Sequence, residues 1–298
     1  MIFWVRFEFK MTANALMVEK LAGAYHSACM LELQALKPGN VHMFADGHGM
    51  TVQDFIKSAD ASASVIAKSN LTVGERILQS VEATHHAVGK NTNLGLILLC
   101  APLIHSALSA GEHQSLQLIL ARTLNQLTGD DGLLAAQAIV LANPAGLGRV
   151  AEYDVHDQAK TSLLTMMQSA QDKDNIAWQY THAFSDIFEF GVPRYITAQK
   201  KWQDRAKTQS DAWAATAIYL GFLARQLDSH VVRKHGEFLA RELMYEARVI
   251  EADYWATDNP KLMQKHLLAW DASLKERNIN PGTSADLTVA CLLVNYLQ

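Results

Sequence analysis

The sequence lacks the features of a nucleic-acid-binding, secreted or membrane-spanning protein. No tract of lysine and arginine is long enough to follow a phosphate backbone, and the net charge of the 298 residues is −4, so nucleic acid is not expected as a partner. The longest apolar run, Leu94 to Leu108, contains Pro102 and His105 and is too short for a bilayer span. We therefore expect a cytoplasmic protein without a membrane partner.

Cysteine is also scarce, and its positions exclude two kinds of site. The three cysteines, Cys29, Cys100 and Cys291, lie far apart in apolar, helical contexts. Their spacing fits neither a disulfide framework nor a metal site. We expect buried free thiols in a reducing compartment.

Helical periodicity dominates the rest of the chain. From Ala13 to Leu36, apolar residues recur at three- and four-residue intervals, which is typical of an amphipathic helix. No useful run of alternating hydrophobicity is present, and 49% of the residues are hydrophobic while 19% are charged, so the core should be substantial. The sequence predicts an all-α fold of about ten or more helices, forming a single compact domain over residues 13–298.

The first residues differ from this pattern. Residues 1–10 alternate apolar and charged side chains, are too short and too charged for a signal peptide, and could form a small strand. Met11-Thr-Ala-Asn resembles a natural start followed by a helix cap, so residues 1–12 are interpreted as an N-terminal appendage or a mis-assigned start. Further along, Thr51-Val-Gln-Asp54 and Thr72-Val-Gly-Glu75 have the pattern of capping boxes that begin helices.

A polar turn, Lys37-Pro-Gly-Asn-Val-His42, follows the first predicted helix. It places a cation, an amide and a titratable ring within six positions on a loop of the kind that carries function. Turns favour Pro, Gly and Asn for local reasons as well, so an ordinary connector with solvated side chains remains the alternative. Glu32 lies about one helical turn earlier and faces either the space of this loop or solvent.

A second polar turn, Gly89-Lys-Asn-Thr-Asn-Leu-Gly95, opens directly into the apolar run. One Asn or Thr would suffice to cap that helix. A lysine, two amides and a hydroxyl beside free backbone N–H groups also form a plausible anion site, because the helix dipole and the unpaired donors favour the same charge.

Three further segments carry similar chemistry. Asp228-Ser-His-Val-Val-Arg-Lys-His-Gly236 combines one carboxylate with two histidines and two cations, and Asn280-Pro-Gly-Thr-Ser-Ala-Asp286 precedes an apolar helix that must be buried. The Gly-rich segment Asn143 to Arg149 is followed by Glu152, Asp154 and Asp157, which offers a cation for phosphate and carboxylates for Mg²⁺.

The four clusters KPGNVH, GKNTNLG, DSHVVRKHG and NPGTSADL resemble, in this order, motifs of the triphosphoribosyl-dephospho-CoA synthase family. The resemblance extends from Glu32 to the C-terminus. It implies an all-helical enzyme that transfers the triphosphoribosyl group of ATP to the ribose 2′-hydroxyl of 3′-dephospho-CoA and releases adenine. The product of that family is the precursor of the prosthetic group of citrate lyase or malonate decarboxylase acyl carrier proteins.

Several positions differ from the family pattern. Asn40 and His42 stand where the synthases tend to have a hydrophobic residue and an acid, Asp228-Ser-His replaces Asp-Thr-Asn, and Ala145-Gly-Leu-Gly148 replaces Gly-Ala-Arg-Gly. The acceptor is therefore open. Alternatives are a paralogue in one-carbon cofactor biosynthesis with pterin or furan carriers, an N-ribosyl hydrolase, and a non-catalytic nucleotide-binding protein.

The resemblance and the chemistry together give a set of expected site residues. An oxocarbenium-like centre calls for a carboxylate and a base, and a triphosphate calls for cations, helix N-termini and Mg²⁺. The expected catalytic residues are Glu32, Asp228 and His235, and the expected Mg²⁺ ligands are Asp228 and Asp286. The expected nucleotide and phosphate contacts are Lys37, Gly39, Asn40, Lys90, Asn91, Thr92, Asn93, Arg149, Arg233, Gly282, Thr283 and Ser284. ATP is the expected substrate, dephospho-CoA or a related acceptor the second one, and a homodimer is left open.

Overall fold

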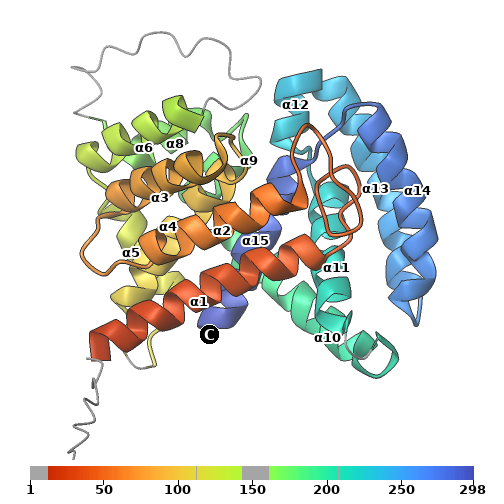
Figure 1. Cartoon of the computed structure of the whole chain (residues 1–298), viewed down its shortest axis with the longest axis horizontal. Coiled ribbons are helices and arrows are strands. Elements are labelled where there is room, and N and C mark those ends of the chain that lie inside the picture. Colours follow the sequence, from red (N-terminus) through yellow and green to blue (C-terminus); the bar gives the residue numbers. More distant parts are fainter. Residues whose placement is uncertain (1–12, 112, 143–160, 207–208) are drawn as a thin grey trace, which may run out of the picture.

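The computed structural model describes residues 13–111, 113–142, 161–206 and 209–298 (Figure 1). Within these ranges the chain forms fourteen α-helices, one π-helical segment and one 3₁₀ segment, with no β-strand. The all-α fold expected from the periodicity is confirmed.

The described helices fall into two consecutive parts of the chain. The first part of the chain contains α1 (Ala13–Gln34), α2 (Val52–Ile66), α3 (Val73–Val88), α4 (Leu94–Leu108), α5 (Leu116–Asn125), α6 (Gly129–Ala142), α8 (Leu163–Ala170) and α9 (Asn175–Thr181). The second part contains η1 (Asp186–Gly191, π-helical), α10 (Val192–Ala206), α11 (Ser210–Arg225), α12 (Ser229–His235), α13 (Glu237–Ala256), η3 (Pro260–Met263), α14 (Gln264–Glu276) and α15 (Gly282–Leu297).

These helices are arranged as two groups around a shared centre. Helices α2 to α6, α8 and α9 lie on one side, and α10 to α14 lie on the other (Figure 1). Helices α1 and α15 run through the middle, and the first turn of α15 lies between α9 and α12 (Figure 1). The start of α15 is therefore placed where the two groups meet.

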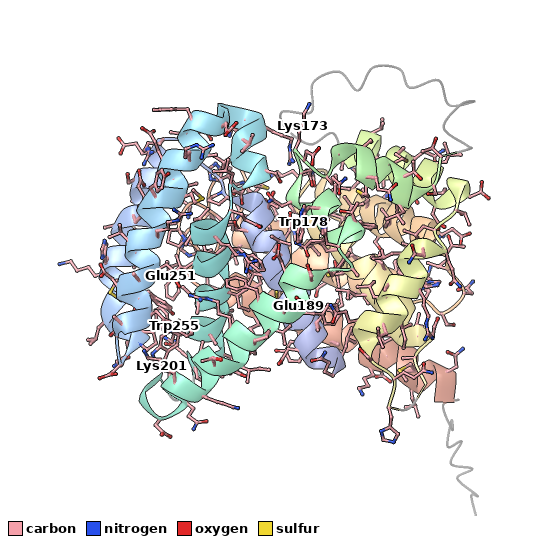
Figure 2. The ribbon with its side chains drawn as sticks, turned by 180° about the vertical axis from the view of Figure 1, so that it is seen from behind. Lys173, Trp178, Glu189, Lys201, Glu251 and Trp255 are labelled. Atoms are coloured by element: carbon pink, nitrogen blue, oxygen red, sulfur yellow. The ribbon has the colours of Figure 1, made fainter. Side chains whose placement is uncertain are left out.

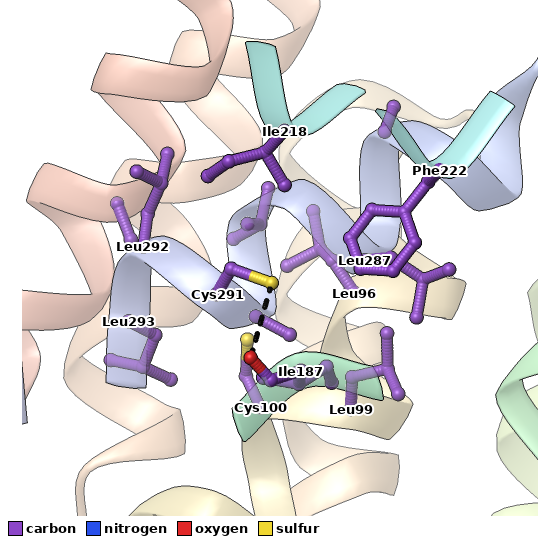
Figure 3. Close-up of a cluster of buried hydrophobic side chains, with 14 of the residues drawn as sticks. Leu96, Leu99, Cys100, Ile187, Ile218, Phe222, Leu287, Cys291, Leu292 and Leu293 are labelled. Carbon is purple, nitrogen blue, oxygen red and sulfur yellow. Dashed lines mark hydrogen bonds between the residues drawn. The ribbon is translucent and has the colours of Figure 1, made fainter. Parts of the chain in front are cut away.

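The body of α15 forms the centre of the core. Leu287 and Cys291 of α15 lie against Phe222 of α11, Ile187 of η1 and Leu99 of α4 (Figure 3), and all five side chains are buried. A helix that is apolar on every side is stable only when it is covered on every side. The expectation that this last helix is buried is confirmed, and the three cysteines are buried free thiols as expected.

Local signals explain where several helices begin. Thr51 with Asp54, and Thr72 with Glu75, form capping boxes at the starts of α2 and α3, which confirms both predictions. Helix α5 ends at Asn125, and α6 begins at Gly129. A reciprocal cap fixes this start of α6. Asp131 accepts from the Thr128 backbone N–H, and the Thr128 hydroxyl accepts from the Asp131 backbone N–H.

The membrane expectation can be compared with the described helices. In residues 13–298, outside the gaps given above, no helix combines the length and apolar character of a membrane span.

Candidate functional site

The turn Lys37 to His42 is buried and held by contacts to α11, α14 and the segment that leads into α15. Gly39 has a φ of 85°, and a Cβ there would lie 2.9 Å from the carbonyl oxygen of Ile279, so glycine is required for the close approach. The Tyr219 hydroxyl donates to the Pro38 carbonyl at 2.6 Å, and the Gly39 N–H donates to Asp271 Oδ1 at 2.8 Å. The interpretation of this turn as a solvated connector is wrong.

The amine of Lys37 points into the protein. It is 0% exposed, pairs with the Glu32 carboxylate and donates to Asn40 Oδ1 at 3.1 Å. Asn40 in turn donates to Asn280 Oδ1 at 2.8 Å. Glu32 is therefore not a solvated surface acid, because its carboxylate faces the space of the loop.

The Glu32–Lys37 pair has perturbed proton affinities. Burial raises the pKa of Glu32, and the charge of Lys37 opposes this rise. Burial likewise lowers the pKa of Lys37, and Glu32 opposes that change. A carboxylate whose pKa is raised by burial holds a proton more readily than a solvated one, which is a common property of catalytic acids and bases.

His42 and Asp271 lie on the other side of the turn. His42 is 0% exposed, and its Nε2 lies 3.3 Å from Asp271 Oδ1 but off the line of a hydrogen bond. The Phe44 N–H donates to His42 Nδ1 at 3.3 Å. Lys275 completes the group by donating to Asp271 Oδ2 at 3.0 Å. This arrangement braces the turn against α14.

Asp228 caps two helices with one carboxylate. Its Oδ1 accepts from the N–H groups of His230 and Val231 at the start of α12. Its Oδ2 accepts from both the N–H and the hydroxyl of Ser284 in the first turn of α15, at 2.7 and 2.8 Å. Asp228 thus fixes α12 against α15, and its oxygens are already engaged by protein donors.

A third helix start joins this junction. The Asn175 N–H donates to Ser229 Oγ at 3.3 Å, and the Ser229 N–H donates back to Asn175 Oδ1 at 2.9 Å. The hydroxyls of Ser229 and Thr283 lie 3.0 Å apart. A Cβ on Gly282 would lie 2.5 Å from His230 Nδ1, so glycine permits the close packing of the α15 start on α12.

Arg233 connects α12 to the start of α9. Its Nη1 donates to Asp174 Oδ2 at 2.6 Å, while Asp174 Oδ1 caps α9 through the N–H groups of Ile176 and Ala177. Arg233 Nε is buried and has no hydrogen-bond partner among the described residues.

Asp286 differs from the other acids at the junction. In the described part of the chain its carboxylate has no hydrogen bond or ion pair, and it lies against Gly95 in the first turn of α4, where a Cβ would be 2.0 Å from Oδ2. Burial raises the pKa of Asp286 well above its ordinary value, and the neighbouring carboxylates of Glu32 and Asp228 raise it further. Asp286 therefore has oxygens free to meet a ligand.

The turn Gly89 to Gly95 is engaged within the protein. Lys90 donates to Asp54 Oδ2 at 2.9 Å and to the Gly49 carbonyl at 3.0 Å, and the Leu94 N–H donates to Asn91 Oδ1. Thr92 bonds to the Ser58 hydroxyl, and Asn93 donates to the Thr84 hydroxyl. Their contacts to phosphate stay predictions, since each would require a protein bond to be shared or exchanged.

Two other expected residues lie away from the junction or outside the description. His235 is at the far end of α12 from Asp228, which is about 10 Å for a helix of this length, and its Nε2 lies 3.0 Å from the Asn278 carbonyl. Arg149 and the acids that follow it lie outside the described residues.

The geometry therefore brings together Glu32, Lys37, Asp228, Arg233, Thr283, Ser284 and Asp286, with Asp174 and Asn175 added by the structure. Sequence reasoning missed the last two, although Asp-Asn before an apolar helical pattern is an N-cap signal. The first turns of α4, α9, α12 and α15 meet here, and helix N-termini favour negative charge.

The fit of Mg²⁺ to this junction follows from the donors. In the described ranges there is no group of three or more His, Cys, Asp or Glu side chains placed to hold a metal. Mg²⁺ is usually held by one or two carboxylates together with substrate phosphates. The uncommitted oxygens of Asp286 fit that mode, whereas Asp228 would have to give up a hydrogen bond.

Comparison with known proteins identifies the family. The profile of a family described as CitG, ATP:dephospho-CoA triphosphoribosyl transferase, matches residues 18–298. The chain belongs to this transferase family. The match spans all four motif clusters, so the resemblance noted from them is confirmed.

A solved structure supports the fold of the CitG-family chain. A crystal structure from Archaeoglobus fulgidus, itself assigned by inference as a triphosphoribosyl-dephospho-CoA synthase, superposes with a TM-score of 0.60 at 23% identity. The alignment covers 82% of this chain and 97% of the archaeal one. None of the curated proteins compared with this chain matches it significantly.

Proposed function

We propose that this CitG-family protein transfers the triphosphoribosyl group of ATP to a hydroxyl of 3′-dephospho-CoA or a related acceptor and releases adenine. The family match supports the reaction class. The observation that carries the site is Asp286, an acid that has no hydrogen bond or ion pair within the described residues and lies at the meeting point of four helix starts.

The reaction requires one bond to form and one to break. The acceptor oxygen bonds to C1′ of the ATP ribose, and the C1′–N9 bond breaks with its electron pair passing to adenine. The acceptor hydroxyl loses its proton to a base, and adenine takes one up. The ribose carbon becomes oxocarbenium-like, so a nearby carboxylate lowers the barrier.

Each residue at the junction has a role in this scheme. Glu32 is the base we assign, because burial raises its pKa and Lys37 holds its position. Asp228 fixes the first turns of α12 and α15 against each other by accepting from their N–H groups, and the positive ends of these helices attract the phosphates. A Mg²⁺ ion bound with ATP would neutralise part of the triphosphate charge, and Asp286 is the residue that would hold it. His235 has a lesser claim as base, given its place at the far end of α12.

The proposal fits the remaining expectations. The three buried free thiols support the cytoplasmic location inferred from the sequence. The acceptor is proposed from the family description, since Asn40 and His42 are braced within the turn and do not by themselves select one.

The test is incubation of the purified protein with ATP, Mg²⁺ and 3′-dephospho-CoA. We expect adenine release and a mass gain on the acceptor equal to one triphosphoribosyl group, both dependent on the acceptor. Asp286→Asn should reduce adenine release by about a hundredfold or more, by analogy with the loss of one electrostatic catalytic group. The matched control is Asp60→Asn, because Asp60 is an exposed acid on α2.

Other products would contradict the proposal in distinct ways. Adenine release without any acceptor would favour an N-ribosyl hydrolase. Release of phosphate or pyrophosphate alone would exclude ribosyl transfer. Nucleotide binding without any turnover would favour the non-catalytic alternative.

A further inference from the structure

Arg225, the last residue of α11, belongs to an ion pair that none of the four motif clusters contains. Its Nη2 lies 3.1 Å from Asp186 Oδ1. The Arg225 side chain is 51% exposed, whereas that of Asp186 is 7% exposed. The carboxylate is thus an internal anchor, and the guanidinium extends from it toward solvent.

Two further contacts fix the direction of the guanidinium. Gln179 Nε2 donates to Asp186 Oδ2 at 3.1 Å, which orients the carboxylate from behind. The guanidinium carbon of Arg225 lies 4.7 Å from the centre of the Phe190 ring, a cation–π distance. Arg225 is therefore held in one orientation by a buried acid and an aromatic face.

The backbone that supplies these partners is strained. Ala183 and Phe184 both have left-handed φ values, 46° and 57°, and Asp186 begins the π-helical segment η1. Such conformations cost free energy in residues other than glycine and persist where the surroundings enforce them. The strain has the effect of bringing Asp186 beneath Arg225.

The free donors distinguish Arg225 from a structural arginine. Fully buried Arg76 donates to the carbonyls of Ile66, Lys68 and Leu71, so its charge serves the fold. Among the residues that the structure describes, Arg225 has a single polar contact, the one with Asp186. Its other N–H groups face solvent in a fixed fork, which suits an anion with several oxygens.

The position of Arg225 relates it to the proposed site. The Arg225–Asp186 pair and the Arg233–Asp174 pair both join the α9–η1 segment, which supplies the acid, to the α11–α12 segment, which supplies the arginine. Asp228 lies between the two arginines in sequence and caps α12 at the junction. The rear view in Figure 2 shows the α9–η1 segment, marked by Trp178 and Glu189, beside the helices of the second group.

We propose that Arg225 is a second phosphate-binding residue of this protein, positioned by Asp186 and Gln179, and that together with Arg233 it binds the phosphate chain of a substrate. This inference rests on the proposed function only for the identity of the substrate that carries the phosphates. The phosphates belong either to the triphosphate of ATP or to the diphosphate of a dephospho-CoA-type acceptor, and both present the same chemistry to a guanidinium.

The experiment measures binding of tripolyphosphate, ATP and 3′-dephospho-CoA to the full-length protein by calorimetry. Arg225→Gln should weaken at least one of them by about ten- to hundredfold, the range for losing a hydrogen bond to a charged group. Weaker tripolyphosphate and ATP binding assigns Arg225 to the donor, and weaker dephospho-CoA binding alone assigns it to the acceptor. Arg225→Lys keeps the charge without the fork and should bind with intermediate affinity; it also serves if the Gln variant does not fold.

The matched control is Arg241→Gln, because Arg241 is 49% exposed and pairs with exposed Glu237 one turn away on α13. Asp186→Asn tests the positioning role of Asp186. It should weaken binding of the same ligand that Arg225→Gln affects, while the affinities for the other ligands stay unchanged. Affinities for all three ligands equal to those of Arg241→Gln would overturn the proposal. If the unmodified protein releases adenine and Arg225→Gln binds all three ligands normally, the proposal for Arg225 is rejected and the proposed transferase function stands. If the unmodified protein releases no adenine but Arg225→Gln binds tripolyphosphate more weakly, the proposal for Arg225 stands and the transferase function is rejected.

Discussion

At the scale of single residues, burial decides the chemistry of the polar turn. Lys37 and His42 are charged or titratable side chains in a loop, and both are 0% exposed. Removing such groups from water costs free energy unless partners replace the lost hydration. Glu32 serves Lys37 in this way, whereas His42 Nε2 lies near the Asp271 carboxylate without a hydrogen bond to it.

His42 gives a pH dependence with a defined sign. Burial lowers the pKa of His42 from its ordinary value of 6.5, and Asp271 opposes this while Lys275 and Lys37 add to it. The unfolded chain therefore takes up this proton more readily than the folded one, so stability falls as the pH drops below about 6.5. We expect the urea concentration at the unfolding midpoint to decrease when the pH is lowered from 7.5 to 5.5. This decrease should be smaller in His42→Gln. The control His26→Gln replaces a partly exposed histidine, and an equal fall in both variants would contradict the assignment.

The sequence predicted which residues form the polar turn but not which of them are buried. The turn and its glycine followed from the sequence, which left open whether Glu32 faces the loop or solvent. Burial of Lys37 did not follow, since no local pattern shows that Tyr219, Asp271 and Asn280 close over the turn from distant positions. Arg225 was missed for the same reason, because its anchor lies 39 residues earlier, on a strained segment without a sequence signature.

At the scale of helices, two glycines in helices have opposite roles. Gly23 lies within α1, and a Cβ there would meet nothing within 4 Å. Gly95 lies in the first turn of α4, and a Cβ there would lie 2.0 Å from the Asp286 carboxylate. The first glycine is a weakness of the helix, and the second makes room for the acid.

These glycines yield a paired prediction. Gly23→Ala should stabilise the protein by up to about 1 kcal/mol, the helix-propensity difference, without changing turnover. Gly95→Ala should displace Asp286 and lower turnover by about a hundredfold, as misplacement of a catalytic group by an ångström can do. Urea unfolding and adenine release measure the two effects. Full activity in Gly95→Ala would remove Asp286 from the proposed mechanism.

Helix boundaries were predicted where local chemistry sets them. The capping boxes at the starts of α2 and α3 were expected from the sequence. The π-helical segment η1 was not, because its left-handed neighbours Ala183 and Phe184 are imposed by packing, with Phe184 fully buried. Local propensity carries no information about a conformation that only tertiary contacts stabilise.

At the scale of the whole molecule, the proposed site lies between two groups of helices. Asp174 and Gly95 come from the first group, and Asp228 and Arg233 from the second. A ligand that contacts both groups stabilises their association as well as each helix start. Binding should therefore be visible in both groups at once.

Hydrogen exchange tests this arrangement. At an ATP concentration of 100 times Kd, the free energy of unfolding should rise by about 2.7 kcal/mol. Amides in the first turns of both α9 and α12 should exchange more slowly, while those of α5, which caps the outer side of the first group, should show no local protection. Slower exchange in only one group would show that the ligand does not bridge the junction.

The position of α15 has a consequence for synthesis of the chain. This helix supplies both the centre of the core and the first-turn residues Thr283, Ser284 and Asp286, and it follows every other described helix in the sequence. While it is still within the ribosome, the parts of α1, α4 and α11 that pack against α15 lack this partner, and exposed apolar surface favours aggregation and chaperone capture of nascent chains. Completion of the core and assembly of the proposed site then both depend on this one helix.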